Sequence, residues 1–229
     1  MAVALIVAAG RGERLGSGRP KALATLSGRP MLEWSVRALR AVPAVEAIVV
    51  ALPAGTAFSP SPGAPSGRER LLTVSGGRTR SESVRAALAA APPGDPVIVH
   101  DAARPLATAE LFERALTEMR LGDADAVIAA VPVSDTIKEV DEDGRRVART
   151  LERKRLWAAQ TPQVFAREAL ERVLADASPA LLASATDDAW LIERAGGAVR
   201  IMDSDPANIK VTTPDDLRVA EMLLSERQR

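Results

Sequence analysis

Four cationic side chains follow a glycine-rich turn near the start of the chain. Arg11, Arg14, Arg19 and Lys21 lie within eleven residues, in the stretch AAGRGERLGSGRPKAL that begins at Ala8. Glycines let backbone N–H groups approach an anion closely. So many cations suit a triphosphate attacked at its α-phosphate, where negative charge develops on oxygen. Only four of the 30 basic residues are lysines, so Lys21 favours a point-charge contact with phosphate.

The spacing of the glycines fits neither common nucleotide fingerprint. Gly10, Gly12 and Gly16 are followed by Pro20, and Leu15 stands where a dinucleotide fingerprint has its third glycine. The G-K-[ST] ending of a Walker A loop is also absent. Taken alone, this stretch leaves open a plain glycine turn with solvated arginines.

The elements that position this loop alternate between strand and helix. Continuous apolar runs predict buried strands at 3–9, 45–52, 71–74, 96–102 and 125–133. A period near 3.6 residues predicts helices at 29–42, where Pro30 suits the first turn, and at 79–91 and 107–120. Such alternation implies right-handed βαβ units. We expect an α/β, Rossmann-like three-layer fold with a mostly parallel sheet, in a single domain over residues 1–229.

The alternation breaks at residues 134–153. TIKEV and RRVART alternate polar and apolar residues around the turn sequence DEDG, which predicts a β-hairpin. Its polar character suggests an arm that projects from the body. Helices are expected afterwards at 166–177 and 186–196, a strand at 198–205, and a last helix that Thr213, Pro214 and Asp216 begin.

Composition excludes several classes of function. The formal net charge is zero, so we expect no general affinity for nucleic acid or for an anionic membrane. The chain has no cysteine, which excludes disulfides, thiolate metal sites and cysteine nucleophiles. The one histidine, His100, is expected to be partly buried, with its hydrogen bonds satisfied and without chemistry. Neither a membrane span nor a signal peptide is predicted, so we expect a cytoplasmic protein.

Seven segments in order carry a resemblance to a known family. They are the opening loop, GGRTRSESV (76–84), VHDAARP (99–105), VSDTIK (133–138), LWAAQTPQVF (156–165), TDDA (186–189) and NIKVT (208–212). The chain resembles the sugar-phosphate nucleotidyltransferases, and within them the 2-C-methyl-D-erythritol 4-phosphate cytidylyltransferase family of the non-mevalonate isoprenoid pathway. The resemblance covers nearly the whole chain.

The resemblance implies a reaction, a metal and a partner. The reaction joins CTP and 2-C-methyl-D-erythritol 4-phosphate, a sugar-alcohol phosphate, to give the CDP-alcohol and pyrophosphate. It implies Mg²⁺ or another divalent cation, and a homodimer in which the arm reaches across a two-fold interface. The fold implied is the nucleotidyltransferase variant of the Rossmann-like architecture.

The resemblance also implies roles for particular residues. The catalytic residues would be Arg14, Lys21, Arg153 and Lys210. The nucleotide would be bound by Ala8, Ala9, Gly10, Gly76, Gly77, Ser83, Asp101 and Ala102. The acceptor would be bound by Asp101, Arg104, Thr136, Arg153, Thr161, Thr186 and Lys210. Asp101 ends a predicted strand at the ligand edge of the sheet and would also be the metal ligand.

Alternatives stay open beside this interpretation. Arg78 and Ala207 stand where relatives carry acidic residues, which leaves their base and phosphate contacts open. A ribitol 5-phosphate cytidylyltransferase shares most of the motifs, and a non-catalytic nucleotide-binding regulator is a further alternative. A dinucleotide-dependent dehydrogenase is disfavoured by the loop spacing and by the lack of an acidic residue after the strand at 45–52.

Overall fold

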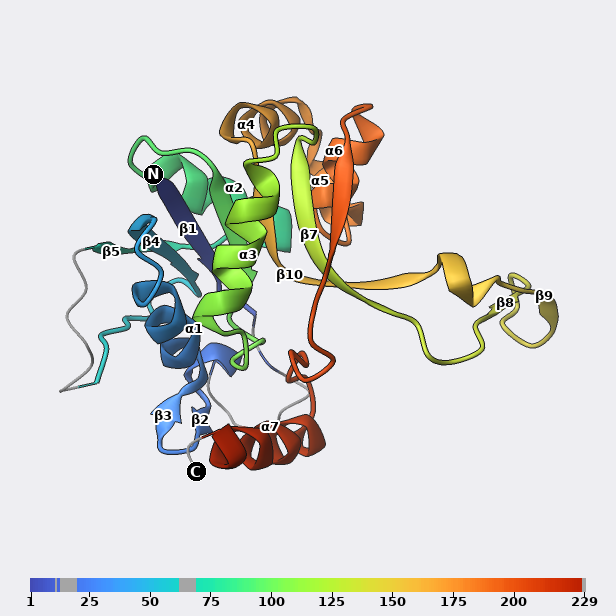
Figure 1. Ribbon diagram of the computed structural model, residues 1–229, viewed down its shortest axis with the longest axis horizontal. Coiled ribbons are helices and arrows are strands. Elements are labelled where there is room, and N and C mark those ends of the chain that lie inside the picture. Colours follow the sequence, from blue (N-terminus) through green and yellow to red (C-terminus); the bar gives the residue numbers. More distant parts are fainter. Residues whose placement is uncertain (11, 13–19, 62–68, 228–229) are drawn as a thin grey trace.

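A seven-stranded sheet forms the centre of the computed structural model, which describes residues 1–10, 12, 20–61 and 69–227 (Figure 1). The strand order is β11-β7-β10-β6-β1-β4-β5. The bounds are β1 (Ala2–Val7), β4 (Val45–Leu52), β5 (Arg70–Ser75), β6 (Val97–Asp101), β7 (Ala126–Pro132), β10 (Trp157–Phe165) and β11 (Val199–Asp203). All neighbouring pairs are parallel except those of β10, which is antiparallel to β6 and to β7. The predicted mostly parallel sheet is confirmed.

Helices cover both faces of this sheet, as the α/β prediction requires (Figure 1). On one face lie α1 (Met31–Arg40) and α3 (Ala109–Met119). On the other lie α2 (Arg80–Ala90), α4 (Arg167–Asp176), α5 (Pro179–Ser184) and α6 (Asp188–Arg194). Successive residues of β1 point to opposite faces, so Ala4 and Ile6 pack under α1 and α3, and Val3 and Leu5 pack under the other helices. The short helix α5 was not predicted.

A third apolar cluster joins the C-terminal helix to the segment after the glycine-rich loop. Helix α7 (Pro214–Arg227) packs on the short strand β2 (Thr25–Leu26), which pairs with β3 (Arg29–Pro30). Neither short strand was predicted from the sequence. The predicted start of α7 is confirmed, because Thr213 and Asp216 exchange hydrogen bonds at its N-terminus. Pro30 lies just before α1 rather than in its first turn, since the helix begins at Met31.

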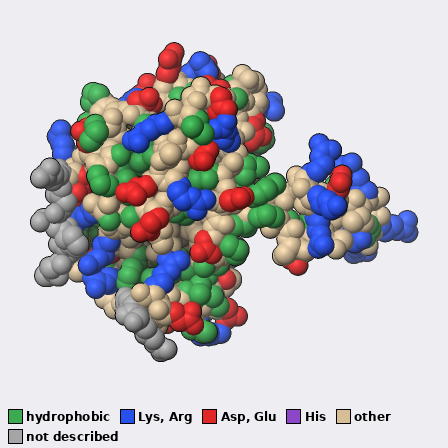
Figure 2. Space-filling view, viewed as in Figure 1, with side chains coloured by type: hydrophobic (Ala, Val, Ile, Leu, Met, Phe, Trp, Pro, Cys, Tyr) green, Lys and Arg blue, Asp and Glu red, His purple; other side chains and the backbone are tan. Residues whose placement is uncertain are grey.

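The predicted arm is a β-hairpin of β8 (Lys138–Val140) and β9 (Val147–Thr150), followed by a turn of 3₁₀-helix, η3 (Arg153–Arg155). It projects from the body between β7 and β10, and a narrow neck joins it to the rest (Figures 1 and 2). Both of its strands are exposed throughout. Strand β10, at the root of the arm, was not predicted, although its residues carry one of the family motifs.

Candidate active site

The carboxyl ends of the parallel strands surround a hollow of about 250 Å³. Ala8, Ala9 and Gly10 follow β1, and Asp101 and Ala102 lie at the end of β6. Gly77, Ser83, Lys21 and Lys210 complete the predicted residues that line this space. We call this space the nucleotide hollow. The family resemblance assigns nucleotide binding to eight described residues, and all but one of them line it.

Gly76 does not line the nucleotide hollow itself but packs against Ala9, which does. A Cβ atom on Gly76 would lie 2.4 Å from the Cβ of Ala9, and one on Gly77 would lie 2.2 Å from the Cβ of Glu82. Neither position therefore has room for a side chain. Ser83 is buried; its Oγ accepts a hydrogen bond from the Gly77 N–H (3.1 Å) and donates one to the carbonyl of Thr79 (2.9 Å). Its hydroxyl thus holds the glycine turn against the start of α2.

A second hollow, of about 200 Å³, adjoins the first. Its lining includes Arg104, Thr161 and Thr186, which sequence analysis assigned to the acceptor, and we call it the acceptor hollow. Asp101, Lys210 and Arg80 line both spaces. These three side chains form a shared wall between the nucleotide hollow and the acceptor hollow.

Asp101 is held from two sides within this wall. Its Oδ1 lies 3.0 Å from Nε of Arg80, and its Oδ2 lies 2.7 Å from Nζ of Lys210. Burial alone would raise the pKa of Asp101, but the charges of Arg80 and Lys210 hold that pKa well below its usual range. The Asp101 backbone N–H donates to Oγ1 of Thr161 at 3.0 Å. The carboxylate is therefore ionised at neutral pH and fixed in orientation.

His100, on the opposite side of β6 from Asp101, is fully buried, whereas the sequence predicted partial burial. Its Nε2 lies 3.2 Å from the carbonyl oxygen of Arg104, so this nitrogen carries the proton. Its Nδ1 then accepts from the hydroxyl of Thr161, at 3.1 Å. Burial lowers the pKa of His100 to about 4, against a smaller opposing effect of Asp101. The ring is neutral and its hydrogen bonds are internal, which leaves it no part in proton transfer.

The segment that carries Lys210 has no regular secondary structure and is fixed by buried hydrogen bonds. Arg104 Nη1 donates to the carbonyl of Asn208 at 2.7 Å. Asn208 Nδ2 donates to Oε1 of Gln160 (2.8 Å) and to the carbonyl of Thr161 (2.9 Å). Arg104 thus lines the acceptor hollow and also holds the backbone that positions Lys210.

Sequence analysis missed the residues that organise this wall. Arg80 pairs with Asp101 and, by a short contact, with Asp188, the first residue of α6. Gln160 and Asn208 join β10 to the Lys210 segment. One signal was available, because Arg80 begins α2, where the helix dipole disfavours a positive charge. An arginine in that place needs carboxylate partners.

Some predicted residues lie elsewhere. Thr136 and Arg153 belong to the arm, where Arg153 Nη1 donates to the carbonyl of Ser134 at 2.7 Å. Neither lines the two hollows of its own chain. Arg14 lies outside the described residues, as do Arg11 and Arg19.

Arg78 and Ala207 are the two residues that depart from the family pattern, and neither belongs to the shared wall. The Arg78 side chain is 89% exposed at the rim of the nucleotide hollow. The backbone N–H of Ala207 donates to Oδ1 of Asp205 at 2.8 Å, so an acidic side chain two residues earlier closes this turn. No contact of either residue with a base or phosphate follows from these positions.

Few side chains at this site could act as ligands for a divalent cation. Within the described residues, no group of three or more His, Cys, Asp and Glu side chains could hold a metal ion. Asp101 supplies one ionised carboxylate on the shared wall. Mg²⁺ commonly takes one or two carboxylates, with phosphate oxygens and water as its other ligands. Asp101 therefore fits a Mg²⁺ ion that would arrive with a nucleoside triphosphate.

Comparison with known proteins places the chain in a family. The model of the family "2-C-methyl-D-erythritol 4-phosphate cytidylyltransferase" matches residues 2–226. The chain belongs to this family. A 2-C-methyl-D-erythritol 4-phosphate cytidylyltransferase of Parasynechococcus marenigrum is 43% identical, over 98% of each chain. One of Nocardia farcinica is 45% identical, over 98% of this chain and 94% of the relative.

Solved structures of the cytidylyltransferase family share the fold. The crystal structure of 2-C-methyl-D-erythritol 4-phosphate cytidylyltransferase from Thermus thermophilus has a TM-score of 0.79 and 32% identity, over 98% of this chain and 100% of that one. The 4-diphosphocytidyl-2C-methyl-D-erythritol synthase of Anaerococcus prevotii has a TM-score of 0.80 and 27% identity, over 98% of both chains. Among the described residues, no helix has the length and apolar character needed to cross a membrane.

Proposed function

We propose that the chain transfers CMP from CTP to 2-C-methyl-D-erythritol 4-phosphate, which gives 4-diphosphocytidyl-2-C-methyl-D-erythritol and pyrophosphate. The observation that carries this is the shared wall. A nucleotide in one hollow and a sugar-alcohol phosphate in the other would meet across Asp101, Lys210 and Arg80. Membership of the cytidylyltransferase family supplies the identity of the two substrates.

The mechanism needs no general base from the protein. The acceptor is a phosphate monoester, whose second pKa is about 6, so it is largely ionised near pH 7. It attacks the α-phosphorus of CTP in line, and pyrophosphate leaves. Lys21, on the wall of the nucleotide hollow, would neutralise charge that grows on the α-phosphate, and Arg14 would share this role. Lys210 would hold the attacking phosphate.

Asp101 is the proposed ligand for Mg²⁺, which would shield the negative charges of the triphosphate when bound. The Asp101→Asn variant should require more Mg²⁺ for half-maximal activity, because an amide oxygen is a poorer ligand for a hard dication. The measurement is a Mg²⁺ titration of initial rates, in which the wild-type chain is the reference. An identical titration curve for both proteins would show that Asp101 does not bind the metal.

A homodimer with shared sites is the proposed assembly. The arm's exposed apolar side chains, Val140 and Val147, are 48% and 58% exposed and would be covered by a second subunit. Thr136 and Arg153 would then reach the acceptor hollow of the partner by a two-fold arrangement. A cytoplasmic location and the absence of nucleic-acid partners stay predictions of the sequence.

A two-by-two assay tests the reaction. CTP or UTP is combined with 2-C-methyl-D-erythritol 4-phosphate or with ribitol 5-phosphate, and release of pyrophosphate is measured. We expect turnover only with CTP and the erythritol phosphate. Preference for ribitol 5-phosphate would identify the alternative cytidylyltransferase. Nucleotide binding without turnover in any combination would instead support the regulator.

A further inference from the structure

Arg80 occupies an unusual position for a positive charge. It is the first residue of α2, directly after the N-cap residue Thr79, and its side chain is 20% exposed. Backbone N–H groups already make the start of a helix positive, which favours acidic residues there. Burial alone would lower the pKa of Arg80, but Asp188 and Asp101 raise it above its usual value. The guanidinium stays charged, and the two carboxylates stabilise it where it is.

The two carboxylates come from different elements of the fold. Asp101 is the last residue of β6, and its Oδ1 accepts from Nε of Arg80. Asp188 is the first residue of α6, and its Oδ2 accepts from Nη1 of Arg80. The turn before Asp188 contains Thr186 and Asp187, which both line the acceptor hollow. Asp188 itself is fully buried. Arg80 therefore joins the carboxylate of the shared wall to the acceptor-binding turn.

Polar atoms without a hydrogen-bond partner gather around the same hollow. In the described part of the chain, seven buried side-chain atoms make no hydrogen bond, and among them are Nη2 of Arg80, Nε of Arg104 and Oε1 of Gln163. These three residues line the acceptor hollow. Buried polar groups normally have partners. The three atoms are enclosed by protein and not exposed to the hollow, so they mark a polar, closely packed wall around it.

We propose that Arg80 is a positioning residue for the acceptor, and that it acts through Asp101 and Asp188. This inference rests on the proposed function. Arg80 fixes the Asp101 carboxylate at Oδ1, so that the same carboxylate orients Lys210 through Oδ2. Through its pair with Asp188, it also fixes the turn that carries Thr186. Lysine cannot replace it, because one ammonium group does not span two carboxylates as the planar fork of arginine does.

The test compares Asp188→Asn and Arg80→Lys with a matched control, Arg85→Lys, at an exposed position on the same helix. Three quantities are measured on the full chain: kcat/KM for the acceptor at saturating CTP, the Kd of CTP without acceptor, and the thermal midpoint. For Asp188→Asn we expect kcat/KM to fall by about 10²-fold, a loss typical of misplacing a reacting group by about 1 Å. The Kd of CTP should stay within about threefold by the same argument.

A double variant tests whether Arg80 and Asp188 act together. Because both residues act in one unit, Arg80→Lys combined with Asp188→Asn should lose about as much as Arg80→Lys alone. The Arg85→Lys control should match the wild-type chain in all three quantities.

Three results would overturn the proposal. The first is an unchanged kcat/KM for the acceptor in Asp188→Asn. The second is an equal loss in CTP binding and in acceptor kcat/KM, which would indicate a general structural role. The third is loss of folding in both variants, which would make the pair a stabilising contact. Turnover of the wild-type chain in the same assay tests the proposed function separately, so the two failures are distinguishable.

Discussion

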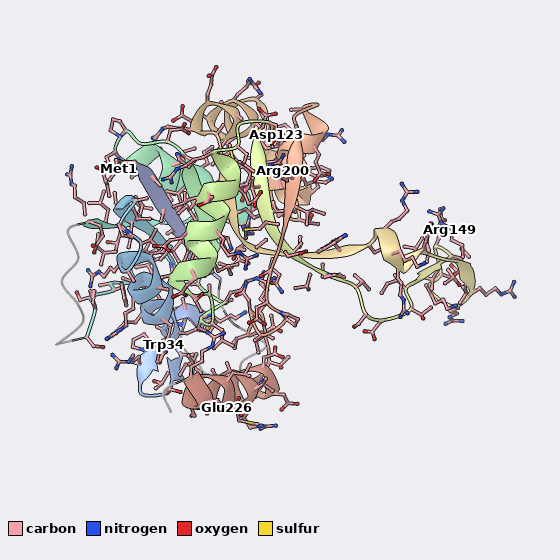
Figure 3. The ribbon with its side chains drawn as sticks, viewed as in Figure 1. Met1, Trp34, Asp123, Arg149, Arg200 and Glu226 are labelled. Atoms are coloured by element: carbon pink, nitrogen blue, oxygen red, sulfur yellow. The ribbon has the colours of Figure 1, made fainter. Side chains whose placement is uncertain are left out.

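Ion pairs in the body and in the arm have similar lengths but different surroundings. On the shared wall, Arg80 and Asp101 are 3.0 Å apart, with side chains 20% and 10% exposed. On the arm, Arg149 and Glu139 are 2.6 Å apart, with side chains 68% and 46% exposed (Figure 3). Removing one partner of a buried pair leaves an uncompensated charge, whereas water and salt screen an exposed pair. Distance alone therefore does not show which pair the protein depends on.

The two regions differ in apolar packing as well. Helices bury both faces of the central sheet, but the hairpin of β8 and β9 leaves every residue of both strands exposed. An isolated two-stranded hairpin is at best marginally stable in water. The body positions its charges by its own packing, whereas the exposed hairpin would be stabilised by a second surface.

Replacing Lys21 on the nucleotide side should produce the largest loss. For Lys21→Ala we expect kcat to fall by about 10²–10³-fold, the usual cost of removing one group that stabilises transition-state charge. The KM for CTP should rise much less, because the charge matters most when negative charge grows on the α-phosphate. Steady-state kinetics with varied CTP measure both. A kcat within a few-fold of the wild-type value would show that Lys21 has another role.

Mixing two inactive variants tests whether the arm serves a partner. Arg153→Ala and Lys21→Ala proteins are each expected to be nearly inactive. After subunit exchange, a mixed dimer would have one site with both residues intact. About half of the dimers would be mixed, so roughly a quarter of the wild-type activity should return. The controls are each variant exchanged with itself and a measurement that shows exchange. Without recovery, Arg153 does not act in the partner's site.

Burial of His100 should make the body sensitive to acid. The folded-state pKa is about 4 and the ordinary value is 6.5, so between these values the unfolded chain binds the proton more readily. Stability should fall as the pH decreases from 6.5 towards 4, by about 3 kcal/mol at about 1.4 kcal/mol per pKa unit. Denaturant unfolding at several pH values measures this, with His100→Gln as the comparison. If the glutamine variant showed the same pH slope, the acid sensitivity would come from other groups.

Breaking the exposed pair on the arm should have the smallest effect. Arg149→Ala should change the free energy of unfolding by less than about 1 kcal/mol, because both side chains are largely solvated. Thermal unfolding at low and high salt measures the change, and salt should reduce it further. A loss of several kcal/mol would mean that this pair is buried in the assembly, and that the arm's charges form part of an interface.

The sequence predicts much of the body because its signals are local. Continuous apolar runs reveal parallel strands covered on both faces, and Thr213 with Asp216 reveals the start of α7. Strand β10 escapes this approach because Thr161, Pro162 and Gln163 interrupt its apolar character. A shift of register also falls between Ala159 and Gln163, so its residues do not alternate regularly.

The acceptor side of the site could be predicted only in part. The family motifs name Arg104, Thr161, Thr186 and Lys210, which the fold brings to one hollow. They do not name the links that hold these residues in place. Arg80 meets Asp188 across 108 positions of sequence, and Asn208 meets Gln160 across 48. Such pairs become visible only when the topology has placed their elements side by side.

The arm begins and ends on neighbouring strands, and this has a consequence for how the family can diverge. Pro132 of β7 and Trp157 of β10 face each other in the antiparallel ladder, so the chain leaves the body and returns to it at one place. Apart from Thr136 and Arg153, the residues between them can lengthen, shorten or change without altering the register of the sheet, since that register is set on the body side of this pair. Substitutions elsewhere on the arm can therefore accumulate while the sheet that positions Asp101 keeps its register.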